Sequence, residues 1–85
     1  MEVEYKKKAQ QDRQYWKEQG NIAIQDRIST LIEDICKHPF TGIGKPEPLK
    51  YELTGLWSRH ITKKHRIIYE VLNGRISIIS MRGHY

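Results

Sequence analysis

The chain has 85 residues, 38% of them hydrophobic and 29% charged, with a net charge of +5, and this composition predicts one folded domain over residues 1–85. No apolar run approaches the roughly 20 residues that cross a bilayer, and no secretory signal begins the chain, so we expect a cytoplasmic protein with no membrane partner. The lone Cys36 excludes an intramolecular disulfide and paired-cysteine zinc or redox motifs.

The beginning of the chain predicts a short strand and then a helix. Val3 and Tyr5 alternate with glutamates, which indicates an edge strand. The composition of residues 8–18 favours a helix whose anchors on the core are Ala9 and Trp16. Gly20 and the residue after it are a helix stop signal, which separates this helix from the next.

A second helix is predicted from its cap and its apolar period. Asn21 can cap the first turn, and His38 before Pro39 ends the helix because the residue before proline is displaced from the α region. Apolar residues recur at three- and four-residue steps and form one continuous face for a sheet to cover. They are Ile24, Ile28, Leu31, Ile32 and Ile35.

The second half of the chain changes to the period of β-strands. A loop rich in Gly and Pro spans residues 40–49, and Asn73-Gly74 is the hairpin signal of a type I′ turn. Lys63-Lys64 indicates another turn. The predicted strands cover residues 49–53, 57–62, 65–72 and 75 to about 81. Two N-terminal helices followed by such strands predict an α+β fold, with both helices packed on one face of a mostly antiparallel, twisted sheet.

The excess positive charge lies in this second half. Residues 46–85 carry seven Lys or Arg against three Asp or Glu, whereas residues 1–45 carry eight against seven. His60, His65 and His84 also lie there. The region is therefore a candidate phosphate-binding surface, and a solvated basic face is an equally good interpretation.

Several residues in this half could carry chemistry, and each has a plainer interpretation. Glu47, between two prolines, has a restricted direction but is also an ordinary loop carboxylate. Arg66 lies in an apolar strand and needs an anion, either a carboxylate such as Glu70 or Glu52 or a ligand phosphate. The remaining candidates are His60 and His65, beside the lysine turn, Arg59, and His84 and Tyr85 at the end of the chain.

The pattern argues against metal-dependent chemistry. The histidines lack the spacing of a zinc site, so we expect no metal and no cofactor. Gly42-Ile43-Gly44-Lys45 lacks the Ser or Thr and the helix of a phosphate loop. RNA supplies its own nucleophile, the ribose 2′-hydroxyl, so that a carboxylate base, an arginine and a histidine acid suffice to cut it.

Several segments of the chain form a restrictive pattern, of which the Pro-Phe…Gly-x-Gly-Lys-Pro-Glu-Pro-Leu stretch and the His-Tyr end are the most specific parts. The segments are Tyr15-Trp16 and residues 38–49, 55–59, 61–62, 65–66 and 84–85. By this pattern the chain closely resembles, nearly end to end, the YoeB-type toxins of the RelE/ParE toxin-antitoxin superfamily. This resemblance implies a type II toxin that acts as a ribosome-dependent endonuclease on messenger RNA in the A site.

The resemblance also implies roles for four residues. Glu47 would be the general base on the 2′-hydroxyl, Arg66 would bind the phosphate and His84 would be the general acid. Tyr85 would orient the RNA, and the products would be a 2′,3′-cyclic phosphate and a 5′-hydroxyl. In strict register with a two-residue turn, Arg66 and His84 fall on opposite faces of the sheet, so we expect the last strand to bend or bulge near Gly83.

Contacts with the ribosome are expected on the outer face. The residues concerned are Lys50, Arg59, His60, Lys63 and Lys64. The sequence departs from the family pattern at His60, where a second arginine is common, and at the basic residues 6–8, where acidic residues are usual. The histidine would weaken a contact with ribosomal RNA, and the lysine run would alter docking to the antitoxin or the ribosome.

The resemblance implies a YefM/Phd-type antitoxin as partner, with the bacterial ribosome and A-site messenger RNA as targets. Operator DNA would be bound only within the toxin-antitoxin complex, and a homodimer is left open. Two alternative functions remain: a ParE-like toxin that binds gyrase without cutting nucleic acid, and a basic RNA-binding module. Neither needs a carboxylate among the cations, so Glu47 favours the nuclease.

Overall fold

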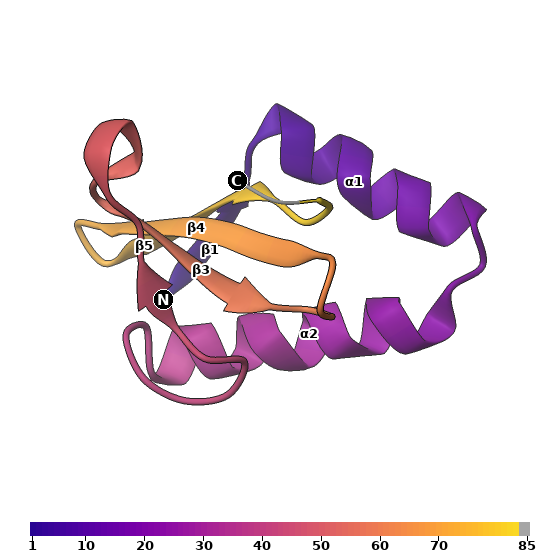
Figure 1. Ribbon diagram of the computed structural model, residues 1–85, viewed down its shortest axis with the longest axis horizontal. Coiled ribbons are helices and arrows are strands. Elements are labelled where there is room, and N and C mark those ends of the chain that lie inside the picture. Colours follow the sequence, from indigo (N-terminus) through magenta and orange to yellow (C-terminus); the bar gives the residue numbers. More distant parts are fainter. Residues whose placement is uncertain (84–85) are drawn as a thin grey trace.

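The computed structural model describes residues 1–83, which form two helices and a five-stranded sheet (Figure 1). The elements follow one another largely in the predicted order. They are β1 (Glu2–Tyr5), α1 (Lys7–Glu18), α2 (Ile22–Lys37), β2 (Glu47–Pro48), the 3₁₀-helix η1 (Tyr51–Leu53), β3 (Leu56–His60), β4 (Arg66–Leu72) and β5 (Arg75–Ser80).

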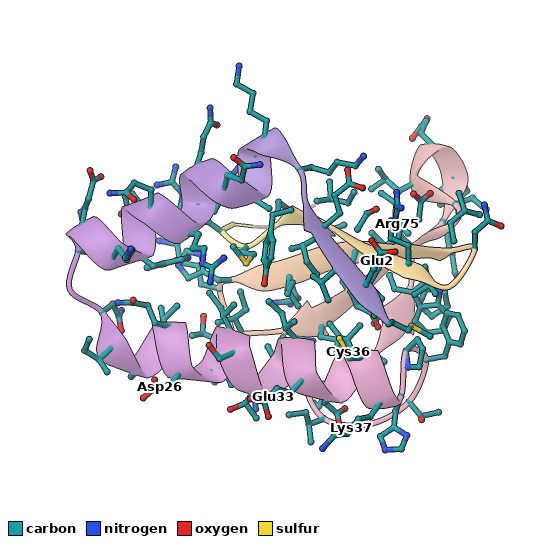
Figure 2. All side chains as sticks on the ribbon, turned by 180° about the vertical axis from the view of Figure 1, so that it is seen from behind. Glu2, Asp26, Glu33, Cys36, Lys37 and Arg75 are labelled. Atoms are coloured by element: carbon teal, nitrogen blue, oxygen red, sulfur yellow. The ribbon has the colours of Figure 1, made fainter. Side chains whose placement is uncertain are left out.

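The sheet has the strand order β1-β5-β4-β3-β2. Its neighbouring pairs are antiparallel except β1 and β5, which are parallel, so the predicted α+β class and the predicted N-terminal edge strand are confirmed. Glu2 and Arg75 lie side by side where these two strands meet, with Nη2 of Arg75 3.8 Å from Oε1 of Glu2 (Figure 2).

The two helices begin and end for local reasons. The Asn21 side chain accepts a hydrogen bond from the backbone N–H of Ile24 at 3.1 Å, as predicted for the cap of α2. At the other end, His38 leaves the helical conformation with φ −139° ahead of a proline. Gly20, with φ +64°, separates α2 from α1.

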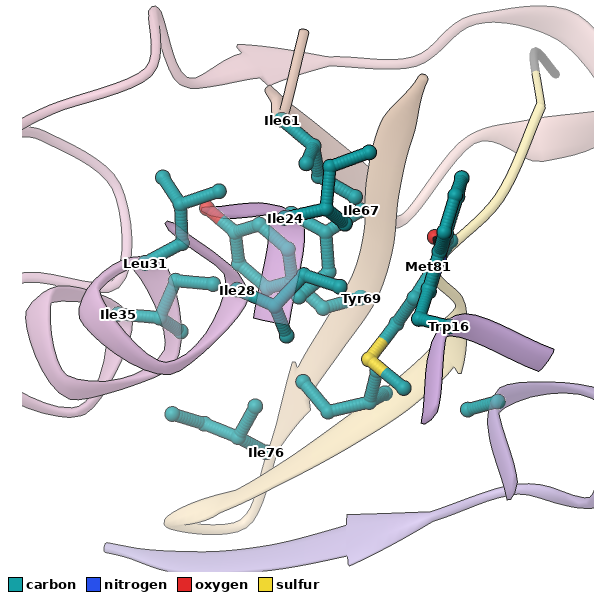
Figure 3. Close-up of a cluster of buried hydrophobic side chains, with 12 residues drawn as sticks. Trp16, Ile24, Ile28, Leu31, Ile35, Ile61, Ile67, Tyr69, Ile76 and Met81 are labelled. Atoms are coloured by element: carbon teal, nitrogen blue, oxygen red, sulfur yellow. Dashed lines mark hydrogen bonds between the residues drawn. The ribbon is translucent and has the colours of Figure 1, made fainter. Parts of the chain in front are cut away.

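Both helices pack against the same face of the sheet (Figure 3). Ala9 and Trp16 are the anchors of α1, as predicted, and α2 contributes a stripe of isoleucines and a leucine. The buried cluster consists of Ala9, Trp16, Ile24, Ile28, Leu31, Ile35, Ile61, Ile67, Tyr69, Ile76, Ile78 and Met81. Polar residues of α2, among them Asp26, Glu33 and Lys37, lie on the side away from the sheet (Figure 2).

The predicted strand over residues 49–53 is wrong. The chain pairs with β3 only over Glu47 and Pro48 and then turns into η1, where Tyr51 has the left-handed φ of +58°. A proline cannot donate to a ladder and is tolerated at a sheet edge, which is where β2 lies. The short strand nevertheless gives Glu47 a fixed position opposite Ser58.

The hairpin of β4 and β5 contains the predicted turn and an irregularity. Asn73 and Gly74 have φ of +53° and +73°, as a type I′ turn requires. Further along, Tyr69 pairs with Ile78 but Ile68 pairs with Ser80, so that one extra residue lies on β5.

The predicted bulge is therefore present, but it precedes the expected position. It lies between residues 78 and 80 of β5, whereas the sequence argument placed it near Gly83. Gly83 does have the positive φ that the argument required, +81°. Because of the bulge, Ile76 and Ile78 are buried before it and the odd-numbered Met81 is buried after it.

Candidate active site

Glu47 and Arg66, two of the candidate catalytic residues, lie on the face of the sheet opposite the helices. Ile67 and Tyr69 of β4 belong to the core, so the alternate residues Arg66 and Ile68 point to the other face. Ser58 is directly opposite Ile68, and Glu47 is directly opposite Ser58, so their side chains share that outer face.

His60 completes this group. It pairs directly with Arg66 across β3 and β4, two residues along from Ser58. Adjacent strands are about 4.8 Å apart, so Glu47, His60 and Arg66 occupy one small area on three neighbouring strands. The outer face thus brings together a carboxylate, an imidazole and a guanidinium.

The surroundings of His60 favour its neutral form. Burial first, and then the positive charges of Arg66 and Lys45, lower the pKa of His60 below its ordinary value of 6.5. The carboxylate of Glu47 opposes this shift. A neutral imidazole can accept a hydrogen bond as well as donate one.

The Arg66 side chain is held by the preceding turn. Its Nη1 donates to the backbone carbonyls of Lys63 at 2.9 Å and Thr62 at 3.3 Å. The sequence left two kinds of anion open for Arg66, a carboxylate such as Glu70 or Glu52 or a ligand phosphate. Within residues 1–83, neither Glu70 nor Glu52 forms an ion pair with Arg66, so these two carboxylates are excluded as its partners. Turn carbonyls fix the direction of the guanidinium and leave its charge unneutralised by these two acids.

Arg59 was expected on the ribosome-facing surface, and this prediction is wrong. The side chain is 0% exposed and points to the helix side, because it shares the face of Trp57 and Ile61. Its Nη1 donates to Asp34 Oδ2 at 2.5 Å, and its Nε donates to the Tyr69 hydroxyl at 3.1 Å. A guanidinium that is buried in this way is satisfied only by a full set of acceptors.

The other acceptors of Arg59 are carbonyls of the loop between α2 and β2. They belong to His38, Thr41 at 2.9 Å and Ile43 at 3.1 Å. The Tyr69 hydroxyl adds a bond to the carbonyl of Pro39 at 2.7 Å. Arg59 therefore ties residues 38–43 to the sheet, and this loop leads directly into Glu47.

Two glycines allow the loop to lie so close. A Cβ on Gly42 would lie 2.0 Å from Asp34 Oδ2, and a Cβ on Gly44 would lie 2.7 Å from Leu31 Cδ2. The carbonyl of Gly44 also accepts the backbone N–H of His60 at 2.7 Å. The Gly-x-Gly stretch, singled out in the sequence, thus serves close packing and not phosphate binding.

The remaining predicted residues have mixed outcomes. Lys50, Lys63 and Lys64 are exposed, which is compatible with RNA binding, and that role stays a prediction. His84 and Tyr85 lie outside the described residues. Among residues 1–83, no group of three His, Cys, Asp or Glu side chains could hold a metal ion, and no helix is long and apolar enough to span a membrane.

Sequence reasoning missed one polar residue of the core. Asp12 of α1 is only 2% exposed, and its Oδ2 accepts the backbone N–H of Met81 at 2.8 Å. Its Oδ1 pairs with Lys8 at 2.6 Å. The signal was available, since Asp12 lies three residues after Ala9 and four before Trp16, on the face that the helix buries.

The arrangement of two helices on one face of a five-stranded sheet is the fold of the YoeB-like toxins. The model of the YoeB-like toxins of bacterial type II toxin-antitoxin systems matches residues 5–85. The toxin YoeB of Escherichia coli (strain K12) is 40% identical over 85 residues, which are 100% of both chains. The chain belongs to the YoeB-like toxin family.

Solved structures agree with this assignment. The YoeB/ParE toxin from Agrobacterium tumefaciens superposes with a TM-score of 0.93 and 36% identity over 100% of both chains. YoeB from Staphylococcus aureus in complex with YefM superposes with a TM-score of 0.89 and 36% identity, over 100% of this chain and 98% of that chain. A YoeB dimer from S. aureus superposes with a TM-score of 0.90 and 35% identity over 100% of this chain and 98% of that chain.

Proposed function

We propose that this toxin is a ribosome-dependent endoribonuclease that cuts messenger RNA in the A site. The observation that carries the proposal is the common outer face of Glu47 and Arg66, where a base and a phosphate-binding cation can reach one ribose-phosphate unit. The YoeB-like sequence ending in His84 and Tyr85 supports the same reaction.

In the proposed reaction, Glu47 takes the proton of the 2′-hydroxyl, and the 2′-oxygen attacks the neighbouring phosphorus. Arg66 binds the phosphate and stabilises the charge that develops on its oxygens. His84 gives a proton to the 5′-oxygen as the bond from phosphorus to that oxygen breaks. Tyr85 orients the RNA, and the products are a 2′,3′-cyclic phosphate and a 5′-hydroxyl.

The ribosome supplies what a small toxin lacks. Single-stranded RNA is flexible, and free message rarely places its 2′-hydroxyl in line with the scissile phosphate. A fixed A-site codon would supply this orientation, which is worth about 7 kcal/mol or more in the best cases. Lys50, Lys63 and Lys64 are exposed and would position the toxin by contacts with ribosomal RNA.

The test is single-turnover cleavage of one message, either free or on ribosomes with an empty A site, at matched salt. We expect Glu47→Ala and Arg66→Ala each to lower the ribosomal rate by at least about 10²-fold. Glu52→Ala, which removes an exposed carboxylate of η1, is the matched control and should leave the rate unchanged. Equal rates on free and ribosomal message would refute ribosome dependence, and full toxicity of Glu47→Ala without cleavage would favour a gyrase-binding toxin.

We also propose an acidic YefM-type antitoxin as the inhibitor. The S. aureus relative is solved with YefM, and the second half of this chain has the excess of positive charge that an acidic segment would cover. A homodimer is the second assembly that the solved S. aureus toxin supports. Antitoxin affinity should fall with added salt only in part, because apolar anchors are not screened.

A further inference from the structure

The last described residues of the chain are held more firmly than chain ends usually are. The backbone N–H of Met81 donates to Asp12 Oδ2 at 2.8 Å, and its carbonyl accepts the indole N–H of Trp16 at 2.9 Å. Met81 itself is 0% exposed (Figure 3). Terminal segments usually fray unless such contacts fix them.

The next two residues have partners of their own. The guanidinium carbon of Arg82 lies 4.0 Å from the centre of the Tyr15 ring. The backbone N–H of Gly83 donates to Nδ1 of His65 at 2.8 Å, and its carbonyl accepts the backbone N–H of Arg66 at 3.0 Å. Side chains of α1 therefore contact residues 81 and 82, and His65 and Arg66 contact Gly83.

These partners also contact one another. The rings of Trp16 and His65 meet edge to face with centroids 4.9 Å apart, and Tyr15 meets Trp16 in the same way at 5.0 Å. The Tyr15-Trp16 pair was part of the family resemblance, but neither residue takes part in the proposed reaction. Their contacts with Met81 and Arg82 give the pair a structural role.

Asp12 both satisfies and directs the backbone next to it. An apolar side chain at this 2% exposed helix position would leave the N–H of Met81 without that acceptor, which the carboxylate supplies. What the carboxylate adds is a directed, charge-assisted hydrogen bond to one backbone N–H, that of Met81. Its geometry fixes the path of the chain three residues before His84.

We propose that Asp12, Trp16 and His65 are positioning residues of the nuclease, which set the place of Gly83 and thereby the reach of His84. The inference rests on the proposed function. A general acid must come within about 2.6–3.2 Å of its acceptor, and a displacement of about 1 Å can cost about 10²-fold in rate. The contacts of Asp12, Trp16 and His65 fix the backbone of residues 81–83, and none of the three is a catalytic residue in the proposed reaction.

The sharpest test uses His65, because two substitutions separate its hydrogen bond from its bulk. His65→Leu removes the acceptor for Gly83, whereas His65→Asn keeps an acceptor at the δ position. We expect His65→Leu to lower the single-turnover rate at saturating ribosomes by about 10- to 100-fold, with less than a twofold change in affinity for the ribosome. His65→Asn should recover most of the loss.

A second readout does not depend on activity. The Gly83 amide should be protected from hydrogen exchange in the wild type and in His65→Asn, and unprotected in His65→Leu, with the exposed Gly74 amide as the unprotected reference. Ile35→Val, a core change on the α2 side of the cluster and well apart from Met81 in Figure 3, controls for lost stability and should leave both the rate and the protection of Gly83 unchanged.

The outcomes separate the two proposals. A wild-type rate in His65→Leu, in a toxin that Glu47→Ala inactivates, would overturn the positioning role and leave the nuclease standing. Gly83 exchange as fast as Gly74 exchange in the wild type would also overturn it. Absence of cleavage by the wild type, with Gly83 protected as described, would instead refute the proposed function.

Discussion

Replacing Arg59 by Ala should destabilise the toxin severely. The substitution removes the partner of the Asp34 carboxylate and the donor for three loop carbonyls, all around a side chain that is 0% exposed. Asp34 keeps 22% of its side-chain surface exposed, so the main loss comes from the loop carbonyls, where each buried group left without a donor costs about 1–3 kcal/mol. At about 0.05–0.15 kcal/mol per residue, an 85-residue chain has only about 4–13 kcal/mol of unfolding free energy.

Urea unfolding followed by tryptophan fluorescence measures this effect. With a slope of about 1–3 kcal/mol per molar urea, the Arg59→Ala midpoint should fall by more than about 1 M. Arg59→Lys should recover only part of the loss, because an ammonium cannot reproduce the planar fork that reaches the loop. Lys50→Ala, an exposed control, should change stability by less than about 0.5 kcal/mol. An Arg59→Ala protein that unfolds like the wild type but binds ribosomes poorly would refute this reasoning and restore the surface role.

Three further outcomes follow from the same region. Gly42→Ala should destabilise the fold more than Gly20→Ala, as measured by urea midpoints, because its Cβ would lie 2.0 Å from Asp34 Oδ2 whereas Gly20 has open space. The hydrogen bond from Arg59 lowers the pKa of Asp34 below its ordinary value of 3.8, so the ionised carboxylate stabilises the fold at pH values above its unfolded pKa. Unfolding measured across an acid titration should show this contribution being lost as the pH falls below about 3.9, and Asp34→Asn should lack it. An NMR titration of His60 should give a midpoint below pH 6.5. Glu47→Gln should lower the pKa of His60 further, because the Glu47 carboxylate raises it, and an upward shift would contradict the assigned geometry.

The sequence predicted most of the fold because periodicity and turn chemistry agree in this chain. The three- and four-residue steps from Ile24 to Ile35 predicted the core face of α2, and Asn73-Gly74 predicted the last hairpin. The strand expected over residues 49–53 failed because the apolar Leu49 and Leu53 suggested a strand where a left-handed Tyr51 ends the pairing. A left-handed backbone conformation of that kind leaves no mark on a hydropathy pattern.

The candidate site was only partly predictable. Glu47 and Arg66 came from the family motif, and the structure brings them to one face. Arg59 was misassigned because its charge was given more weight than its alternation with Trp57 and Ile61, which already placed it on the core side. The contacts of residues 81–83 with α1 join parts of the chain 65 or more residues apart, and a single sequence holds no local signal of such distant pairs.

The parallel pairing of β1 with β5 has a consequence for synthesis of the toxin. β1 leaves the ribosome first, yet its ladder partner is the last strand of the described chain to be made. Contacts so distant in sequence form late and slowly, so the apolar face of α2 stays uncovered while translation continues. We therefore expect the nascent chain to be inactive, and the sheet to close only after the ribosome that made it has released β5.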